Sequence, residues 1–90
     1  MSSFSGIKSI QRGTITISGS SATGTATITA VDTSKTELRY LGHSDTSSTA
    51  PAGRDVWCRI DLTNTTTVTA TRANTGASQI IVSFEVTEYY

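Results

Sequence analysis

The sequence predicts an all-β protein, built as a single six-stranded antiparallel β-sandwich. Six short runs alternate apolar and polar residues with the two-residue period of a β-strand, and no run has the period of a helix. Turn-forming residues separate these runs. Threonine, a β-branched residue that suits strands, fills many of the polar positions. Together these observations favour a small sandwich of short strands.

The last predicted strand, 80–90, organises the rest of the chain because it has the longest clean alternation. Its apolar face needs a second sheet or another subunit to cover it, so we expect the preceding strands to pack around it. The apolar face carries Ile80, Val82, Phe84 and Val86, and the expected wet face carries Ser83, Glu85 and Thr87.

The first two strands are expected at 7–17 and 22–31. The alternation in the first strand shifts midway, and we predict a β-bulge at 11–13, where a glycine allows the local twist. Small residues such as Gly24 and Ala26 occupy the buried face of the second strand. They predict that an opposing surface approaches closely at this point.

The next three strands are expected at 36–41, 56–62 and 66–72. A long loop, 42–53, separates the first two of them and holds the only proline and the only histidine of the chain. Long loops in small β domains often carry the contacts to other molecules. This loop is therefore a candidate binding segment.

The charge pattern argues against two classes of partner. Seven basic and seven acidic residues give a formal net charge of zero, so no long-range field attracts nucleic acid or an anionic membrane. No stretch approaches the ~20 apolar residues of a membrane span. Arginine suits contacts with carboxylates between subunits. If the third and fourth strands pair, the candidates for such contacts are Glu37, Arg39, Arg59 and Asp61.

The residues that could carry chemistry are too few for catalysis or for a metal or other cofactor. His43, Ser44 and Asp45 are adjacent in a loop and cannot surround one reacting atom. One histidine and one cysteine are too few for a zinc site. Cys58 has no partner for an intrachain disulfide, and its place among alternating apolar residues favours a small buried hydrophobe. We predict that the protein is not an enzyme and needs no cofactor.

Trp57 is the candidate binding aromatic, because it falls on the polar face of the fourth strand together with Arg59 and Asp61. There it would anchor a protein interface, stack on a sugar ring or cover the edge of the core. A sugar site would also use His43 and Asp45 from the long loop.

The two ends of the chain supply further candidates for contacts between copies. We expect a polar N-terminal arm, 1–5, which carries Phe4, followed by one domain, 6–90. Tyr89 and Tyr90 at the other end form a second aromatic candidate, because a terminus without a partner usually frays.

Three segments together resemble small virion proteins of tailed phages: 9–17 (SIQRGTITI), 59–72 (RIDLTNTTTVTATR) and 82–89 (VSFEVTEY). Gln11 and Gly13, followed by a closing strand of alternating apolar residues, are also similar to the six-stranded sandwich of the H-type lectins. That resemblance implies a trimer, and it implies amino-sugar binding at subunit interfaces.

The resulting hypothesis is a non-enzymatic phage structural protein that forms a trimer and decorates or cements the capsid. Its partners would be copies of itself and other virion proteins such as the major capsid protein, and it would reside in the virion after assembly in the host cytoplasm. The alternatives are a glycan-binding module of a fibre or tail that engages host sugars, and a connector at the neck or tail.

Overall fold

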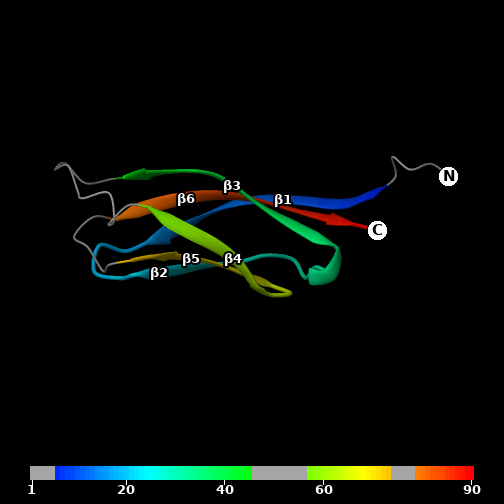
Figure 1. Ribbon diagram of the computed structural model, residues 1–90, viewed down its shortest axis with the longest axis horizontal. Coiled ribbons are helices and arrows are strands. Elements are labelled where there is room, and N and C mark those ends of the chain that lie inside the picture. Colours follow the sequence, from blue (N-terminus) through cyan, green and yellow to red (C-terminus); the bar gives the residue numbers. More distant parts are fainter. Residues whose placement is uncertain (1–5, 46–56, 74–78) are drawn as a thin grey trace.

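The computed structural model describes residues 6–45, 57–73 and 79–90 (Figure 1). The predicted N-terminal arm with Phe4, and residues 46–53 of the predicted long loop, lie outside these ranges. The described residues form six strands and one short 3₁₀ helix, which confirms the all-β prediction. The elements are β1 (Ile7–Ile17), β2 (Thr23–Thr27), η2 (Thr33–Lys35), β3 (Thr36–Asp45), β4 (Cys58–Asn64), β5 (Thr67–Arg72) and β6 (Ile80–Tyr89).

The strands are divided between two three-stranded antiparallel sheets. Sheet one has the order β1-β6-β3, and sheet two has the order β2-β5-β4. Figure 1 shows the two sheets as two layers whose strands run along the length of the molecule. The last strand, β6, lies at the centre of sheet one, as its long alternation leads one to expect.

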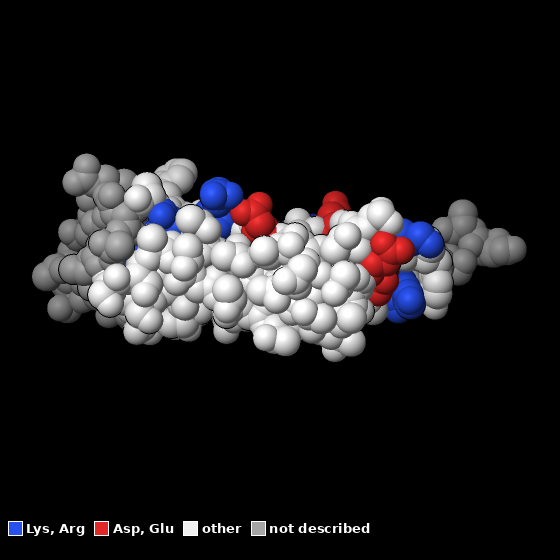
Figure 2. All heavy atoms as spheres, turned by 90° about the horizontal axis from the view of Figure 1, so that it is seen from below, with Lys and Arg blue, Asp and Glu red and all other residues white. Residues whose placement is uncertain are grey.

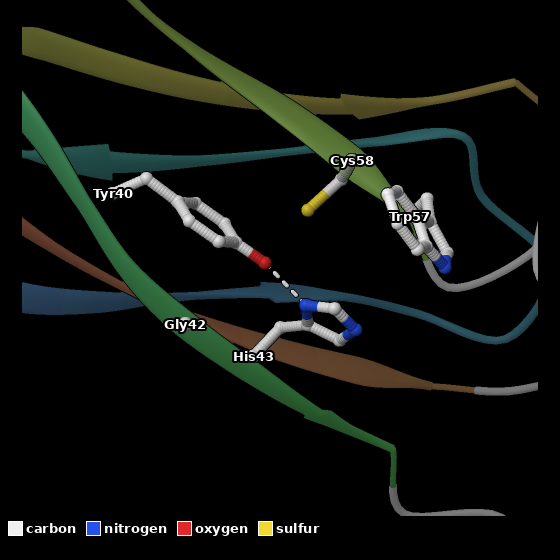
Figure 3. Close-up of a pocket in the computed structure, with 5 residues that line it drawn as sticks. All are labelled: Tyr40, Gly42, His43, Trp57 and Cys58. Carbon is white, nitrogen blue, oxygen red and sulfur yellow. Dashed lines mark hydrogen bonds between the residues drawn. The ribbon is translucent and has the colours of Figure 1, made fainter.

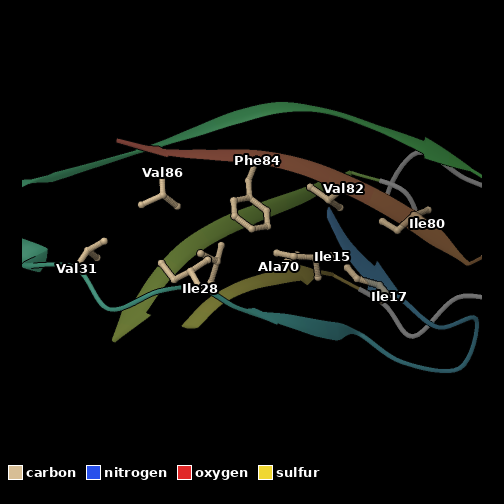
Figure 4. Packing of buried hydrophobic residues seen from close by; sticks show 10 residues of the cluster. Ile15, Ile17, Ile28, Val31, Ala70, Ile80, Val82, Phe84 and Val86 are labelled. Atoms are coloured by element: carbon tan, nitrogen blue, oxygen red, sulfur yellow. The ribbon is translucent and has the colours of Figure 1, made fainter. Parts of the chain in front are cut away.

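The core lies between the two sheets (Figure 4). Apolar residues of β6 and β1 line it from sheet one, and residues of β5 and of the segment after β2 line it from sheet two. The buried residues are Ile15, Ile17, Ile28, Val31, Val68, Ala70, Ile80, Val82, Phe84 and Val86.

The opposite face of β6 is polar, but Glu85 and Thr87 on it are not exposed to solvent. Glu85 is only 8% exposed and Thr87 only 5%, because long side chains from both neighbouring strands lie over them. Arg12 reaches Glu85 from β1, and Arg39 reaches it from β3. The prediction of a solvated face is therefore wrong for these two residues, since a central strand is shielded by its flanking neighbours.

The predicted bulge at 11–13 is also wrong. Pairing between β1 and β6 is continuous from Ser9 to Ile17, and the register shifts instead between Ile7 and Ser9. Gly13 has a different role, because it lies opposite Phe84 and a β-carbon there would stand 3.0 Å from the Phe84 ring. The glycine makes room for an aromatic ring of the core.

Gly24 confirms the predicted close approach at β2. A β-carbon on Gly24 would overlap the backbone carbonyl oxygen of Thr16 and lie 3.0 Å from Cγ2 of Ile15. β2 and β1 therefore touch backbone to backbone at the edge where the two sheets meet.

β2 is shorter than the predicted strand 22–31 because β5, its partner, begins only at Thr67. Beyond β2 the chain is held by other contacts. The Gln11 side-chain amide donates to the carbonyl of Thr29 (3.0 Å), and its oxygen accepts from the Thr29 N–H (2.8 Å). One side chain of sheet one thus takes the place of a strand partner at Thr29, while Ile28 and Val31 still donate to backbone carbonyls of Thr66 and Thr65.

Arg72, at the end of β5, joins sheet two to the turn between β1 and β2. Its side chain is buried and donates to the carbonyls of Ser18 (2.9 Å), Gly19 (3.4 Å) and Ser21 (2.9 Å). The N–H of Arg72 also donates to the carbonyl of Ala22. The Arg72 side chain therefore holds the turn in place through backbone carbonyls of the turn.

The outer face of sheet two is largely uncharged, as the view from that side shows (Figure 2). Three threonines of β2 stand directly opposite three of β5, in the pairs Thr23 with Thr71, Thr25 with Thr69 and Thr27 with Thr67. Charged residues on this sheet belong mainly to β4, where Arg59 and Asp61 form an exposed pair at 2.8 Å.

Candidate functional site

Two surfaces stand out among the described residues. The first, here named the end patch, consists of Ile7, Ile10 and Tyr89 on the outer face of sheet one. The second, the β3–β4 cleft, is lined by Tyr40, Gly42, His43, Trp57 and Cys58. The first is an exposed apolar surface, and the second is a hollow between the two sheets.

The bulge in β1 creates the end patch. Ile10 pairs with Thr87 and Ile7 pairs with Tyr89, and alternate residues of β6 point to the same face. The extra residue between Ile7 and Ser9 therefore places Ile7 and Ile10 on one face, although they are an odd number of residues apart. Ile7 is 50% exposed, Ile10 49% and Tyr89 38%.

A chain of ion pairs borders the end patch and crosses all three strands of sheet one. Arg12 Nε lies 2.8 Å from Glu85 Oε2, and Arg39 Nη1 lies 3.4 Å from Glu85 Oε1. Arg39 Nη2 also lies 2.9 Å from Glu37 Oε1. The Tyr89 hydroxyl donates to the same Glu37 oxygen at 3.2 Å. The patch and its border thus form one connected surface.

These contacts shift two pKa values. The hydrogen bond from Arg12 is the main cause that lowers the pKa of Glu85, and the charges of Arg12 and Arg39 add to it. The hydrogen bond to Glu37 raises the pKa of Tyr89. Glu85 is therefore ionised and Tyr89 neutral at pH 7, the states in which each keeps its bond.

The predicted pairing of the third and fourth strands does not form. β3 belongs to sheet one and β4 to sheet two, so Arg39 and Glu37 are paired with each other and not with Arg59 and Asp61. The local alternation reveals which residues share a face, but it does not reveal which strands are neighbours. Arg39 borders the end patch, whereas Arg59 lies beside Trp57 on the other sheet.

The β3–β4 cleft owes its lining to a second bulge. The register of β3 against β6 shifts between Tyr40 and Gly42, so that Tyr40 pairs with Phe84 and His43 pairs with Val82. Phe84 and Val82 both face the core, and the extra residue, Leu41, brings Tyr40 and His43 to that same side. Gly42 has φ +123°, a conformation that other residues rarely adopt.

Tyr40 and His43 are joined by a hydrogen bond between the Tyr40 hydroxyl and His43 Nδ1, and Cys58 faces them from β4 (Figure 3). Burial, followed by the nearby Cys58, raises the pKa of Tyr40. Burial also raises the pKa of the Cys58 thiol. Cys58 packs against the core as a neutral thiol, in keeping with the predicted hydrophobic role.

Trp57 lies at the mouth of the cleft and is 74% exposed, as expected from its place on the polar face of the predicted strand. It also borders a second hollow with Arg59, Thr71 and Arg72. Trp57 and His43, two of the three residues predicted for a sugar site, therefore line the same cleft.

The remaining predicted residues are distributed differently. His43 and the backbone of Asp45 belong to β3 and not to a loop, because the bulge interrupted the alternation on which the strand prediction rested. The side chain of Asp45 lies outside the described part of the structure. Tyr90 is exposed, and its N–H donates to the carbonyl of Gly6 at 2.7 Å.

Sequence reasoning missed Ile7 and Ile10 of the end patch as site residues, and in the cleft it missed Tyr40. The signal that could have revealed Tyr40 is the pair Leu41-Gly42, where an apolar residue breaks the alternation directly before a glycine. Such a break indicates a bulge, and a bulge places residues of opposite parity on one face.

Within the described ranges, no three His, Cys, Asp or Glu residues lie close enough together to hold a metal ion. Nor do these ranges contain a helix of the length and apolarity needed to cross a membrane. No protein-family model, curated protein or solved structure matches this chain.

Proposed function

We propose that the chain is a non-enzymatic structural subunit of a tailed-phage particle, which associates with copies of itself, as a trimer, and decorates or cements the capsid. The end patch is the observation that supports self-association. The resemblance to phage virion proteins supports the location, and the resemblance to the H-type lectins supports the threefold symmetry.

The end patch has the composition of a protein interface. Half-exposed isoleucines, Ile7 and Ile10, lie next to Tyr89, and the ion pairs of Arg12 and Arg39 border them. Interfaces are enriched in aromatic residues and arginine, with an apolar centre and a polar rim. Full burial of one such apolar side chain stabilises a protein or a complex by roughly 1.5–3 kcal/mol. Because Ile7 and Ile10 are half exposed in the single chain, about half of this stabilisation remains to be gained on association.

The charged border of the patch favours a partner with both signs of charge. Arg12 and Arg39 remain 68% and 55% exposed in their side chains, and each already contacts Glu85. Covering them would therefore leave no charge without its counterpart. A second copy of this chain, which has equal numbers of basic and acidic residues, is such a partner, whereas nucleic acid carries only negative charge.

Substitution of Ile10 tests the proposal. Ile10→Ser should weaken self-association by about tenfold or more, because it removes an apolar group at the centre of the contact. Leu41→Ser is the matched control, since Leu41 is 48% exposed, like Ile10 at 49%, but lies on the opposite edge strand of sheet one. Native mass spectrometry and sedimentation would measure the mass and affinity of the assembly.

A wild-type protein that stays monomeric at high concentration, and that fails to bind particles lacking it, would overturn the proposal. If the protein does assemble, a reconstruction of the particle would distinguish decoration from a connector role. Density on the capsid supports decoration, and density at the neck or tail supports a connector with the same mode of association.

A further inference from the structure

We infer that the β3–β4 cleft binds a neutral sugar ring, with Trp57 as the stacking surface and the Tyr40–His43 pair as the hydrogen-bonding group. This inference goes beyond self-association, because it concerns a different surface and a small ligand. It rests on the position of the cleft, the chemistry of its lining and the exposure of Trp57.

The cleft lies where the two sheets diverge. β3 and β4 are edge strands of different sheets, and the space between them has a volume of about 510 Å³. Small-molecule sites are concave spaces of this order, with mostly apolar walls and a few polar groups. The bulge at Leu41 and the conformation of Gly42 turn two polar aromatic side chains into this space.

The described lining combines apolar faces with neutral polar groups. Tyr40 and Trp57 supply aromatic surface, and the Tyr40 hydroxyl binds His43 Nδ1, which fixes the imidazole ring. In Figure 3 the other ring nitrogen of His43 points away from Tyr40. This second nitrogen is available for a hydrogen bond with a ligand hydroxyl, which can act as donor or as acceptor.

Trp57 supplies the apolar contact. A tryptophan that is 74% exposed leaves a large aromatic face in water, next to a hollow with volume enough for a sugar ring. One face of a pyranose consists of C–H groups and its edge consists of hydroxyls. Such a ring can cover the aromatic face while its hydroxyls meet the Tyr40–His43 pair.

The chemistry of the described lining favours a ligand that is both apolar and able to form hydrogen bonds. The described residues of the cleft offer aromatic faces together with the hydroxyl of Tyr40 and the imidazole of His43. A purely apolar ligand would cover the second ring nitrogen of His43 without forming a hydrogen bond to it, which is unfavourable for a polar group removed from water. A neutral polyhydroxyl ring satisfies both requirements.

The experiment uses Trp57 itself as the reporter, since it is the only tryptophan of the chain. The methyl glycosides of glucose, galactose, mannose and N-acetylglucosamine would be titrated into the full chain at up to high millimolar concentration. At least one should shift the tryptophan emission in a saturable manner. The acyclic polyol mannitol should leave the emission unchanged, and absence of a saturable shift with every glycoside would overturn the inference.

A pair of matched variants locates the site. Tyr40→Phe keeps the ring but removes the hydroxyl that bonds His43, so the affinity for the bound glycoside should fall by about tenfold. Tyr90→Phe makes the same change at an exposed tyrosine outside both the cleft and the end patch, and it should bind as the wild type does. Equal affinity for wild type and Tyr40→Phe, with both folded by near-UV circular dichroism, would remove the cleft as the site.

The assembly variant keeps this inference separate from the proposed function. Ile10→Ser should lose self-association and retain the emission shift, because Ile10 lies outside the cleft. Loss of the shift in this variant would contradict a cleft that is complete within one chain. A monomeric wild-type protein that still shows the shift would overturn the assembly and leave the sugar site standing.

Discussion

At the residue scale, two glycines are required because other atoms occupy the position that a β-carbon would need. Gly13 lies under the ring of Phe84, and Gly24 lies against the backbone of Thr16. The sequence indicated the close approach at Gly24, because small residues repeat on the buried face of β2. It did not indicate the role of Gly13, since a cross-strand neighbour 71 positions away cannot be read from local alternation.

Gly24→Ala should lower the free energy of unfolding by about 1–3 kcal/mol, the usual cost of overpacking. The obstacle is a backbone carbonyl, which cannot move aside as a flexible side chain can. Urea unfolding measures the change. Gly6→Ala is the control, because the nearest atom to its β-carbon would be Tyr89 Cδ1 at 3.9 Å. Equal stability of the two variants would show that β1 and β2 do not approach as described.

Glu85 should make stability depend on pH. Its folded-state pKa is lowered from the ordinary 4.5, first by Arg12, so its contribution is complete above that value and is lost as pH falls through the lower, folded-state pKa. Glu85→Gln should flatten the decrease of the urea midpoint in this acid range. Some dependence should remain, because the bonds from Ser34 lower the pKa of Asp32 as well. An unchanged pH profile in Glu85→Gln would contradict the role given to the carboxylate.

At the element scale, the two bulges decide which side chains meet. The bulge in β1 gathers Ile7 and Ile10 into the end patch, and the bulge in β3 gathers Tyr40 and His43 into the cleft. Alternation predicted the faces of β5 and β6, and also those of β4, where the register shift against β5 comes only after Leu62. It failed in β1 and β3, since one extra residue reverses the parity of everything beyond it.

Gln11 illustrates how a side chain can extend a sheet. Gln11→Ala should raise the hydrogen-exchange rate of the Thr29 amide, because that N–H loses its acceptor. The amides of Ile28 and Val31 serve as internal controls, since they donate to the carbonyls of Thr66 and Thr65 instead. Protection of Thr29 that survives the substitution would show that another group holds this segment.

At the scale of the whole molecule, the fold consists of two thin sheets around a small core. The number of strands and their approximate positions could be predicted from the sequence, and so could the central role of β6. The assignment of strands to each sheet could not, because β1 pairs with β6 across almost the full length of the chain. Pairing over such distances depends on the packing of the entire molecule rather than on local pattern.

Association through the end patch should couple stability to concentration. If only the folded chain associates, the melting temperature should rise with protein concentration, because mass action favours the assembled state. Ile10→Ser should remove this dependence, and Leu41→Ser should retain it. Calorimetric scans over a roughly hundredfold range of protein concentration would measure this dependence. A constant melting temperature in the wild type would argue against an obligate assembly.

The buried guanidinium of Arg72 suggests how distant relatives of this chain could be recognised. Arg72 donates hydrogen bonds to three backbone carbonyls of the turn at 18–21. Because these contacts involve no side chain of the turn, the turn residues are free to vary, whereas the length of the turn must stay the same. A lysine has a single ammonium group and cannot reproduce the planar fork. The expected signature is therefore a fixed spacing from the first strand to its turn, followed by an invariant arginine at the end of the fifth strand.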